Sequence, residues 1–194
     1  MKKNFLILMV GVMLFSCHSN QLDRTIFIPD EDDRNLPAYS EWGYNSFGAE
    51  YERDYFLVSN YIVPCKILYG NNEMQFSLHG TIRYNQDMSL LFIFPSETMS
   101  SYADLLWLNN VEIDLSVVDC SVKMIQNGLE KTLDVFNGTL HFKRAQLLSI
   151  DDEVNRVILS GIFELNFLQN GFPTTISNGR FDMGITTNVF YSMP

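Results

Sequence analysis

The feature that most constrains the fold of this chain is a two-residue alternation of apolar and polar side chains from about residue 61 onward. The run 111–117 alternates at every position, and 74–82 and 163–167 follow the same pattern. A period of two buries one face of a strand, whereas an amphipathic helix needs a period near 3.6. The chain is therefore predicted to be mostly β.

Turn signals separate these runs. Asn-Gly pairs stand at 127–128, 137–138, 170–171 and 178–179, and both residues tolerate the positive φ of tight hairpin turns. The clearest predicted hairpins join 119–126 to 129–136 and 157–168 to 172–176. The acidic triplet 151–153 predicts another turn. Successive strands are therefore expected to be antiparallel neighbours.

One segment departs from the alternation. Ser101 and Asp104 have the spacing of a capping box, and apolar residues follow them, which predicts a short helix over 101–109 with Trp107 in the core. The expected fold is thus all-β and mostly antiparallel with one short helix. Two arrangements stay open, a β-sandwich and a flattened barrel.

The amino terminus has the pattern of an export signal. Lys2 and Lys3 precede an apolar run over 5–15, and Cys17 follows it. This order predicts a signal peptide with a lipobox, cut before Cys17, with acyl groups on that cysteine. The alternative is an ordinary secretory signal with a coincidental cysteine. The apolar run is shorter than the roughly 20 residues that span a bilayer.

The expected organisation has three parts. Residues 1–16 form the signal peptide, 17–36 carry the lipidated cysteine and an acidic tether, and 37–194 form a single β-rich domain. The acidic run 30–33 is interpreted as part of a solvated spacer.

The charge balance is acidic, with 13 Lys and Arg against 23 Asp and Glu. Removing 1–16 takes away two lysines, which leaves 11 basic side chains and a formal net charge of −12. Nucleic-acid binding is therefore not expected, because its affinity rests on basic residues that neutralise phosphates.

Three strand-and-turn motifs carry a resemblance. Residues 138–142 (GTLHF), 159–165 (LSGIFEL) and 176–182 (ISNGRFD) resemble a family of small, functionally uncharacterised all-β envelope lipoproteins of gut anaerobes. The resemblance implies a β-sandwich-like domain displayed on the envelope, and it supplies no catalytic residue. Outer-membrane attachment is expected. Surface-exposed lipoproteins often carry acids directly after the lipidated cysteine, but the first acid here is Asp23, so the membrane face stays open.

The aromatic density over 39–61 is the main candidate for a binding site. Tyrosine and tryptophan can build platforms on which sugar rings stack, and the candidates are Trp42, Tyr44, Tyr39 and Phe47. The alternative is that this segment is a long loop that wraps over the sheet and uses its aromatic side chains as anchors.

Other candidate sites are weaker. Cys65 and Cys120 lie on apolar strand faces, and two fates are open for them, a disulfide or two separate buried thiols. Histidines 18, 79 and 141 are too scattered for a metal site, and 79 and 141 fall on polar strand faces. The acidic clusters lack calcium-loop spacing. No metal or cofactor is expected.

These features lead to one functional hypothesis and one alternative. The first is a non-catalytic cell-envelope lipoprotein, held to the membrane by its lipid, whose β-domain binds a glycan or an envelope protein. The alternative is a structural subunit that assembles with envelope proteins through sheet edges. A hydrolase ranks last, because no catalytic motif is recognisable in the sequence.

Overall fold

The computed structural model describes residues 23–59, 64–83, 85–150 and 153–193. Twelve strands and one short 3-10 helix follow one another along these ranges: β1 Ser46–Tyr51, β2 Asp54–Val58, β3 Cys65–Gly70, β4 Glu73–Ile82, β5 Gln86–Pro95, η2 Tyr102–Leu108, β6 Val111–Asp114, β7 Ser121–Gln126, β8 Leu129–Thr132, β9 Asp134–Ile150, β10 Glu153–Gln169, β11 Phe172–Ile185 and β12 Phe190–Ser192.

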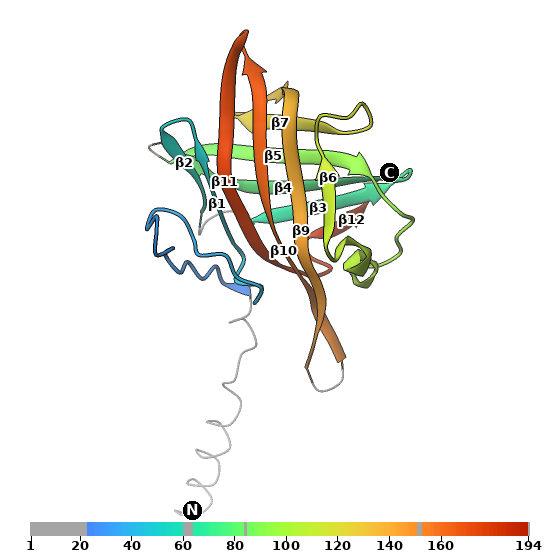
Figure 1. The fold of residues 1–194 in the computed structure, drawn as a ribbon. Helices are drawn as coiled ribbons and strands as arrows, with labels where there is room; N and C mark the ends of the chain where they lie inside the picture. The colour runs from blue at the N-terminus through green and yellow to red at the C-terminus, as the bar shows by residue number, and fades with distance from the viewer. Residues whose placement is uncertain (1–22, 60–63, 84, 151–152, 194) are drawn as a thin grey trace, which may run out of the picture.

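The strands form one continuous sheet folded into two layers. Its order is β6-β9-β10-β11-β1-β2-β4-β5-β7-β8, with β3 also on β4 and β12 on β3. All pairs are antiparallel except β12 with β3. In Figure 1, β9, β10 and β11 cross in front of β3, β4, β5 and β7 at a steep angle, as in orthogonal sheet packing. We call β9, β10 and β11 the front layer.

This architecture confirms the all-β, mostly antiparallel, sandwich-like prediction. Among the strands of the described ranges, β6 and β8 each have a single neighbour, so the sheet does not close on itself. The flattened-barrel alternative is therefore not what the chain adopts.

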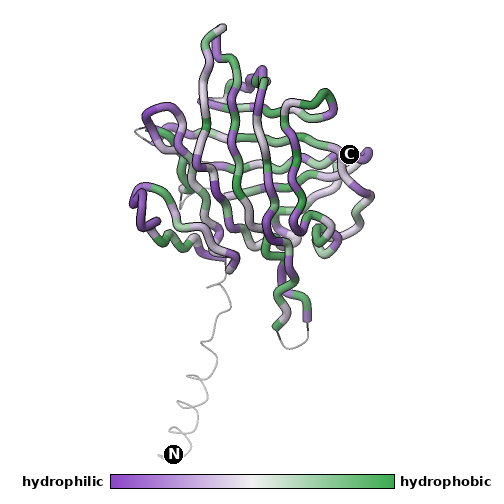
Figure 2. Tube along the Cα trace, in the orientation of Figure 1, coloured by the Kyte–Doolittle hydropathy of each residue, from purple (hydrophilic) through white to green (hydrophobic). Residues whose placement is uncertain are grey.

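Phenylalanine rings join the two layers. The ring of Phe76 on β4 has its centroid 5.6 Å from Phe142 on β9 and 5.1 Å from Phe181 on β11. All three are buried, and the residues beside them along the strands are polar. Figure 2 shows the same alternation of apolar and polar residues along the strands in general. The period of two therefore produces the core, because each strand turns one face toward the opposite layer.

Two of the four Asn-Gly pairs form the predicted hairpin turns. Asn127-Gly128 joins β7 to β8, and Asn170-Gly171 joins β10 to β11. Both asparagines and both glycines have positive φ. The turn predicted at 151–153 joins β9 to β10, with Glu153 paired to Ile150, and 151–152 lie outside the described residues.

The other two Asn-Gly pairs are not hairpin turns. Both lie inside strands, beside register shifts in β9 and β11. At Asn178 φ is +53°, and a Cβ on Gly179 would come within 2.5 Å of the Phe163 carbonyl oxygen. These pairs therefore serve as strand irregularities that allow close packing.

The predicted helix is confirmed, with 3-10 geometry over Tyr102–Leu108. The Asp104 carboxylate accepts hydrogen bonds from the Ser101 amide at 2.9 Å and the Ser100 amide at 2.7 Å. The side chain of Trp107 is half-buried and packs against the core cluster. Within the described ranges, no helix is long and apolar enough to cross a membrane.

The strand that alternates over 111–117 ends earlier than the alternation. Beyond Asp114 the chain turns, because the Asp114 carboxylate accepts a hydrogen bond from the Ser116 amide at 2.9 Å. Val117 and Val118 are consequently exposed. A local side-chain hydrogen bond thus overrides the pattern.

The expected spacer packs against the domain from residue 23 onward. The Arg180 guanidinium donates to the Asp30 carboxylate at 2.6 Å, and Leu36 is buried. The Ala38 amide also donates to the Ile28 carbonyl at 2.7 Å. Residues 23–36 of the predicted tether therefore contact the β-domain, because a cation on β11 pairs with the first acid of the acidic run. The predicted signal peptide, Cys17 and the rest of 1–22 lie outside the described residues.

Candidate functional site: a surface hollow beside Trp42

The backbone of the 40–44 loop is held by one buried carboxylate. Asp182 on β11 is 2% exposed. It accepts hydrogen bonds from the amides of Gly43 at 2.7 Å, Trp42 at 3.1 Å and Tyr44 at 3.2 Å. The hydroxyls of Ser40 and Ser160 also donate to it, at 2.5 and 2.9 Å. The four loop donors therefore fix this loop on the outer side of the front layer, and Ser160 on β10 adds a fifth hydrogen bond to the carboxylate.

Backbone conformation completes the attachment. Gly43 has φ +73°, and a Cβ there would come within 3.2 Å of Ile158. Asn45 has φ +52°, and its side-chain oxygen accepts a hydrogen bond from the Gly184 amide at 2.9 Å. The loop is thus held by Asp182 over residues 40–44 and by the Asn45 side chain just before β1.

The rigid loop leaves the indole of Trp42 in solvent. Its side chain is 72% exposed, although its own amide is bonded to Asp182. Beside it lies a hollow of about 460 Å³, lined by Tyr39, Ser40, Glu41, Trp42 and Gln146. We call this the Trp42 hollow. An exposed aromatic face on a fixed backbone is suited to stacking against a flat apolar surface, such as the face of a sugar ring.

Polar groups surround the hollow. Gln146 on β9 donates its amide to the Glu41 carbonyl at 3.1 Å and accepts from the Arg144 Nε at 3.0 Å. The Tyr39 hydroxyl donates to the Glu41 carboxylate at 2.9 Å, and Lys143 Nζ lies 5.9 Å from the centroid of the Tyr39 ring. Burial, followed by the hydrogen bond to Glu41, raises the pKa of Tyr39 above its ordinary value. Amide, carboxylate and cationic groups thus accompany the aromatic rings.

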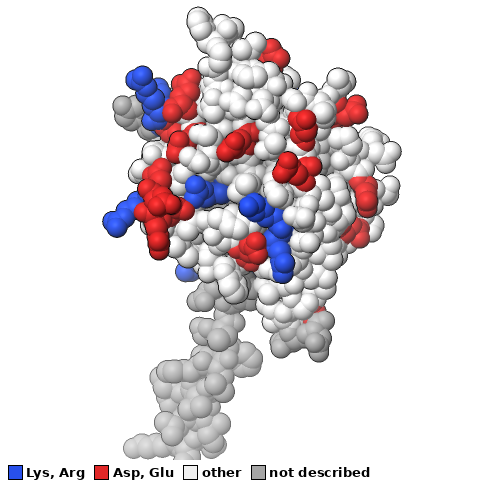
Figure 3. Space-filling view, viewed as in Figure 1, with Lys and Arg blue, Asp and Glu red and all other residues white. Residues whose placement is uncertain are grey.

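The surface charge around this layer is mixed. Figure 3 shows basic side chains over the middle of the front layer with acidic side chains around them. Arg144 lies 4.0 Å from Glu41, and Arg180 is paired with Asp30. The front layer therefore offers both hydrogen-bond donors and acceptors to a ligand.

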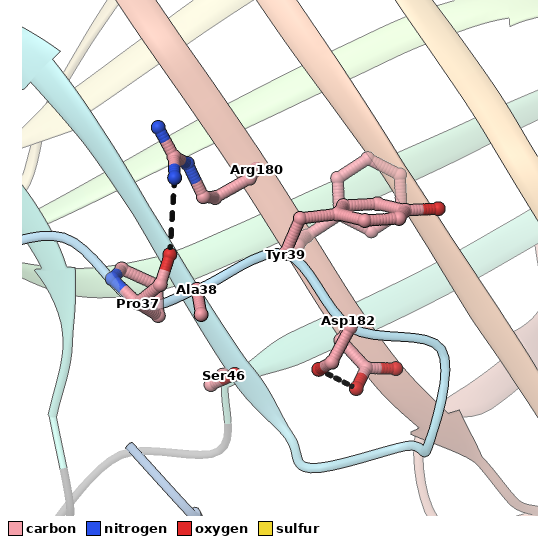
Figure 4. A pocket seen from close by; sticks show the side chains of 8 residues that line it. Pro37, Ala38, Tyr39, Ser46, Arg180 and Asp182 are labelled. Carbon is pink, nitrogen blue, oxygen red and sulfur yellow. Dashed lines mark hydrogen bonds between the residues drawn. The ribbon is translucent and has the colours of Figure 1, made fainter. Parts of the chain in front are cut away.

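Behind the loop, a second gap is too small for a ligand. It lies between Arg180, Asp182, Pro37 and Ser46, as Figure 4 shows, and has no room for a water molecule. Arg180 also donates to the Pro37 carbonyl at 3.4 Å across it. Asp182 therefore serves as a support for the loop, and the open Trp42 hollow is the candidate binding site.

The four aromatic candidates have different positions. Trp42 and Tyr39 line the hollow, whereas Tyr44 is half-buried and is not one of the residues that line it. Phe47 is fully buried on β1, with its ring centroid 4.8 Å from that of Phe56. The prediction of Phe47 as a ligand contact is therefore wrong, because it faces the core.

The segment 39–61 is only partly a loop. Residues 46–51 and 54–58 are β1 and β2 and belong to the sheet itself. A hydrogen-bonded carboxylate, in addition to aromatic anchors, holds the remaining loop at 39–45. Tyr61 lies outside the described residues.

The structure places Cys65 and Cys120 apart as free thiols. Cys65 pairs with Leu78 on β4, Leu78 with Leu90 on β5, and Leu90 with Met124 on β7, the strand that follows Cys120. Three inter-strand steps therefore separate β3, which contains Cys65, from β7, which follows Cys120, by about 14 Å. This is twice the roughly 7 Å between Cα atoms that a disulfide allows. The disulfide considered for this pair is therefore not formed.

The histidines of the described ranges have local partners. His79 is half-buried between the hydroxyls of Ser77 and Ser89, at 2.9 and 2.8 Å, and burial lowers its pKa. His141 lies 3.5 Å from Glu112. Across the described ranges, no group of three or more His, Cys, Asp and Glu residues is arranged to hold a metal ion.

Comparison of the chain with protein-family models, with curated protein sequences and with solved structures finds no match. The site must therefore be interpreted from its own geometry.

Sequence reasoning did not identify Asp182 or Gln146 as parts of the site. Asp182 lies between Phe181 and Met183, so the alternation indicates only that it faces away from the core. Its burial depends on the loop that folds over it. One local signal could have drawn attention to Asp182. It is a carboxylate at an outward strand position within the turn-and-strand motif 176–182.

Proposed function

We propose that this protein is a non-catalytic cell-envelope lipoprotein whose β-domain binds a glycan at the Trp42 hollow. The observation that carries the glycan proposal is Trp42 itself, whose backbone is fixed by Asp182 while its side chain is 72% exposed. A fixed aromatic platform lowers the entropic cost of binding. Stacking on such a ring favours ligands with flat apolar faces and polar edges, as sugars have.

The polar side chains around the hollow support the same ligand class. Glu41 offers acceptors and Gln146 an amide, both beside the indole. The proposal is non-catalytic because the buried carboxylate of this region, Asp182, already accepts five hydrogen bonds. Its role in supporting the loop leaves it poorly placed to act on a ligand.

The lipid anchor is supported by the sequence of the first seventeen residues. We place the protein at the outer membrane, attached through Cys17, with its domain on either the periplasmic or the outer side. The strongly acidic composition opposes nucleic acid as a partner.

Glycan binding is tested with the lipidated protein, purified in detergent and applied to an array of bacterial, plant and mucin glycans. We expect binding that falls at least tenfold in Trp42→Ala and less in Trp42→Phe, because phenylalanine retains a stacking face. The matched control is Phe172→Ala, which removes another exposed aromatic, 74% exposed, at the β10–β11 turn. Binding to no glycan, or equal binding by Trp42→Ala, would refute the proposal.

The anchor is tested in cells with labelled palmitate. We expect label on the wild-type protein and recovery of that protein in the outer-membrane fraction. The Cys17→Ser variant should lack the label and remain uncut. Label that persists in Cys17→Ser would exclude this attachment site.

The alternative proposal is a structural subunit that assembles with envelope proteins through sheet edges. The edge strand β8 has four exposed residues, which favours it. However, Glu130 on β8 is paired with Lys123 at 2.7 Å, and Lys131 adds a charge beside it. Charged edge strands oppose strand addition, so we expect a monomer by sedimentation. Mass that grows with concentration, or an edge-dependent crosslink to an envelope protein, would support the alternative.

A further inference from the structure

The far end of the β9–β10 hairpin forms an arm that leaves the body of the domain. We define the arm as residues 147–150 and 153–156, which pair through Ile150 with Glu153 and Ser149 with Val154. Figure 1 shows that it projects beyond the two layers, at the end of the molecule where the described chain begins.

The arm exposes apolar side chains on both of its faces. Leu147, Ile150 and Val154 are 41%, 44% and 43% exposed. Cross-strand partners share a face, so Leu147 and Val154 lie on the face of buried Val157, and Ile150 lies on the opposite face. Figure 2 shows apolar residues on both strands of the arm. A flat partner would cover one face, whereas a fluid apolar medium would cover both.

The start of the described chain is fixed beside this arm. The Asp23 carboxylate accepts a hydrogen bond from Arg156 at 3.2 Å, and Arg156 is the last arm residue on β10. Cys17 precedes Asp23 by six residues. Because an extended chain covers at most about 3.5 Å per residue, Cys17 lies within about 21 Å of Asp23.

We propose that the arm contacts the lipid bilayer, with Leu147, Ile150 and Val154 in its interfacial region. This inference rests on the lipid anchor at Cys17 in the proposed function. Three partly exposed side chains bind lipid weakly alone, but the short anchor makes the contact intramolecular and raises its effective concentration. Exposed Glu153 at the end of the arm, which follows Asp151 and Asp152 in the sequence, is repelled by anionic headgroups. The surface therefore suits zwitterionic headgroups.

The test uses the full lipidated protein in phosphatidylcholine and phosphatidylethanolamine vesicles that contain a phospholipid with a photoreactive group high in its acyl chain. Trypsin cuts after Arg144 and Arg156, so the peptide 145–156 reports on the whole arm after irradiation and denaturation. The peptide 157–180 serves as the internal control. It contains exposed Phe172 at the β10–β11 turn, which lies at the opposite end of β10 from the arm.

We expect label on 145–156 at least fivefold above 157–180. The label should fall to the control level in the triple variant Leu147→Ser, Ile150→Ser and Val154→Ser, and fall in part in the single variant Ile150→Ser. Phe172→Ser should leave the label on the arm unchanged. The single variant keeps the test decisive if the triple variant does not fold.

Equal label on the two peptides, or undiminished label in Ile150→Ser and the triple variant, would overturn the arm contact while leaving the anchor intact. Protein that does not float with the vesicles would overturn the anchor itself, and the arm contact with it. The two failures are thus distinguished in one experiment.

Discussion

Replacing Asp182 by alanine should release the loop that carries Trp42 and destabilise the whole domain. Of the five donors that this carboxylate binds, the Gly43 amide and the Ser160 hydroxyl make buried hydrogen bonds, and the other three are part-buried. Each buried donor left without an acceptor costs about 1–3 kcal/mol. The part-buried donors can bind water instead, so the free energy of unfolding should fall by about 4 kcal/mol. Such a loss is large against the roughly 5–15 kcal/mol of an ordinary domain.

Urea denaturation followed by circular dichroism measures this loss, and amide hydrogen exchange at 42–44 measures the release of the loop. The control is Asp114→Ala, which removes an exposed carboxylate that, within the described part of the chain, accepts hydrogen bonds from the nearby Ser116. We expect the control to lose less than about 1 kcal/mol. Equal midpoints for the two variants, with unchanged exchange at 42–44, would refute the role assigned to Asp182.

Three further predictions follow from packing and protonation. Gly161→Ala should lower the free energy of unfolding by about 3 kcal/mol, because the added Cβ would lie 2.2 Å from the His141 carbonyl oxygen. Gly128→Ala should lower it by about 1 kcal/mol, because Gly128 has φ +76° but lies in open space. Equal losses for the two variants in urea denaturation would contradict this reasoning. Burial raises the pKa of Cys65 to about 12, so a thiol reagent at pH 8 should modify half-buried Cys120 first. Peptide mass spectrometry measures the two modification rates, and comparable rates for Cys65 and Cys120 would be inconsistent with the burial of Cys65. Burial, followed by the charge of Lys66, lowers the pKa of His79 below 6.5, so the unfolded chain takes up a proton that the folded chain does not, and stability falls as pH drops below 6.5. The fall between pH 7 and 5 should be shallower in His79→Gln, and parallel curves would show that His79 does not contribute.

The strands were predictable because each layer buries one face, so apolar and polar residues alternate along each strand with a period of two. The hairpins at Asn127-Gly128 and Asn170-Gly171 were predictable for a local reason, namely that their turns need positive φ. The pair at Asn178-Gly179 has the same local preference, but its role depends on Phe163 packing across it from the neighbouring strand. A contact of that kind has no local signature.

The candidate site was predictable only in part. Aromatic density drew attention to 39–61, but composition could not separate exposed Trp42 from buried Phe47. The difference arises from Asp182, which lies 140 positions away in the sequence and fixes where the loop turns outward. The contact between the predicted tether and the domain was not predictable for a similar reason, because the partner of Asp30 is the distant Arg180.

The pairing of β1 with β11 bears on the order in which the chain folds. Ser46 pairs with Asp182, so β1 can pair with this neighbour only after a strand 136 positions later in the sequence has been made. Contacts of such long range form slowly, because a long loop must close first. The export that we propose requires an unfolded chain during translocation, and slow pairing of β1 with β11 favours that requirement. The Trp42 loop needs the same strand, because Asp182 on β11 accepts its amide hydrogen bonds, so the loop should be assembled only after β11 is in place.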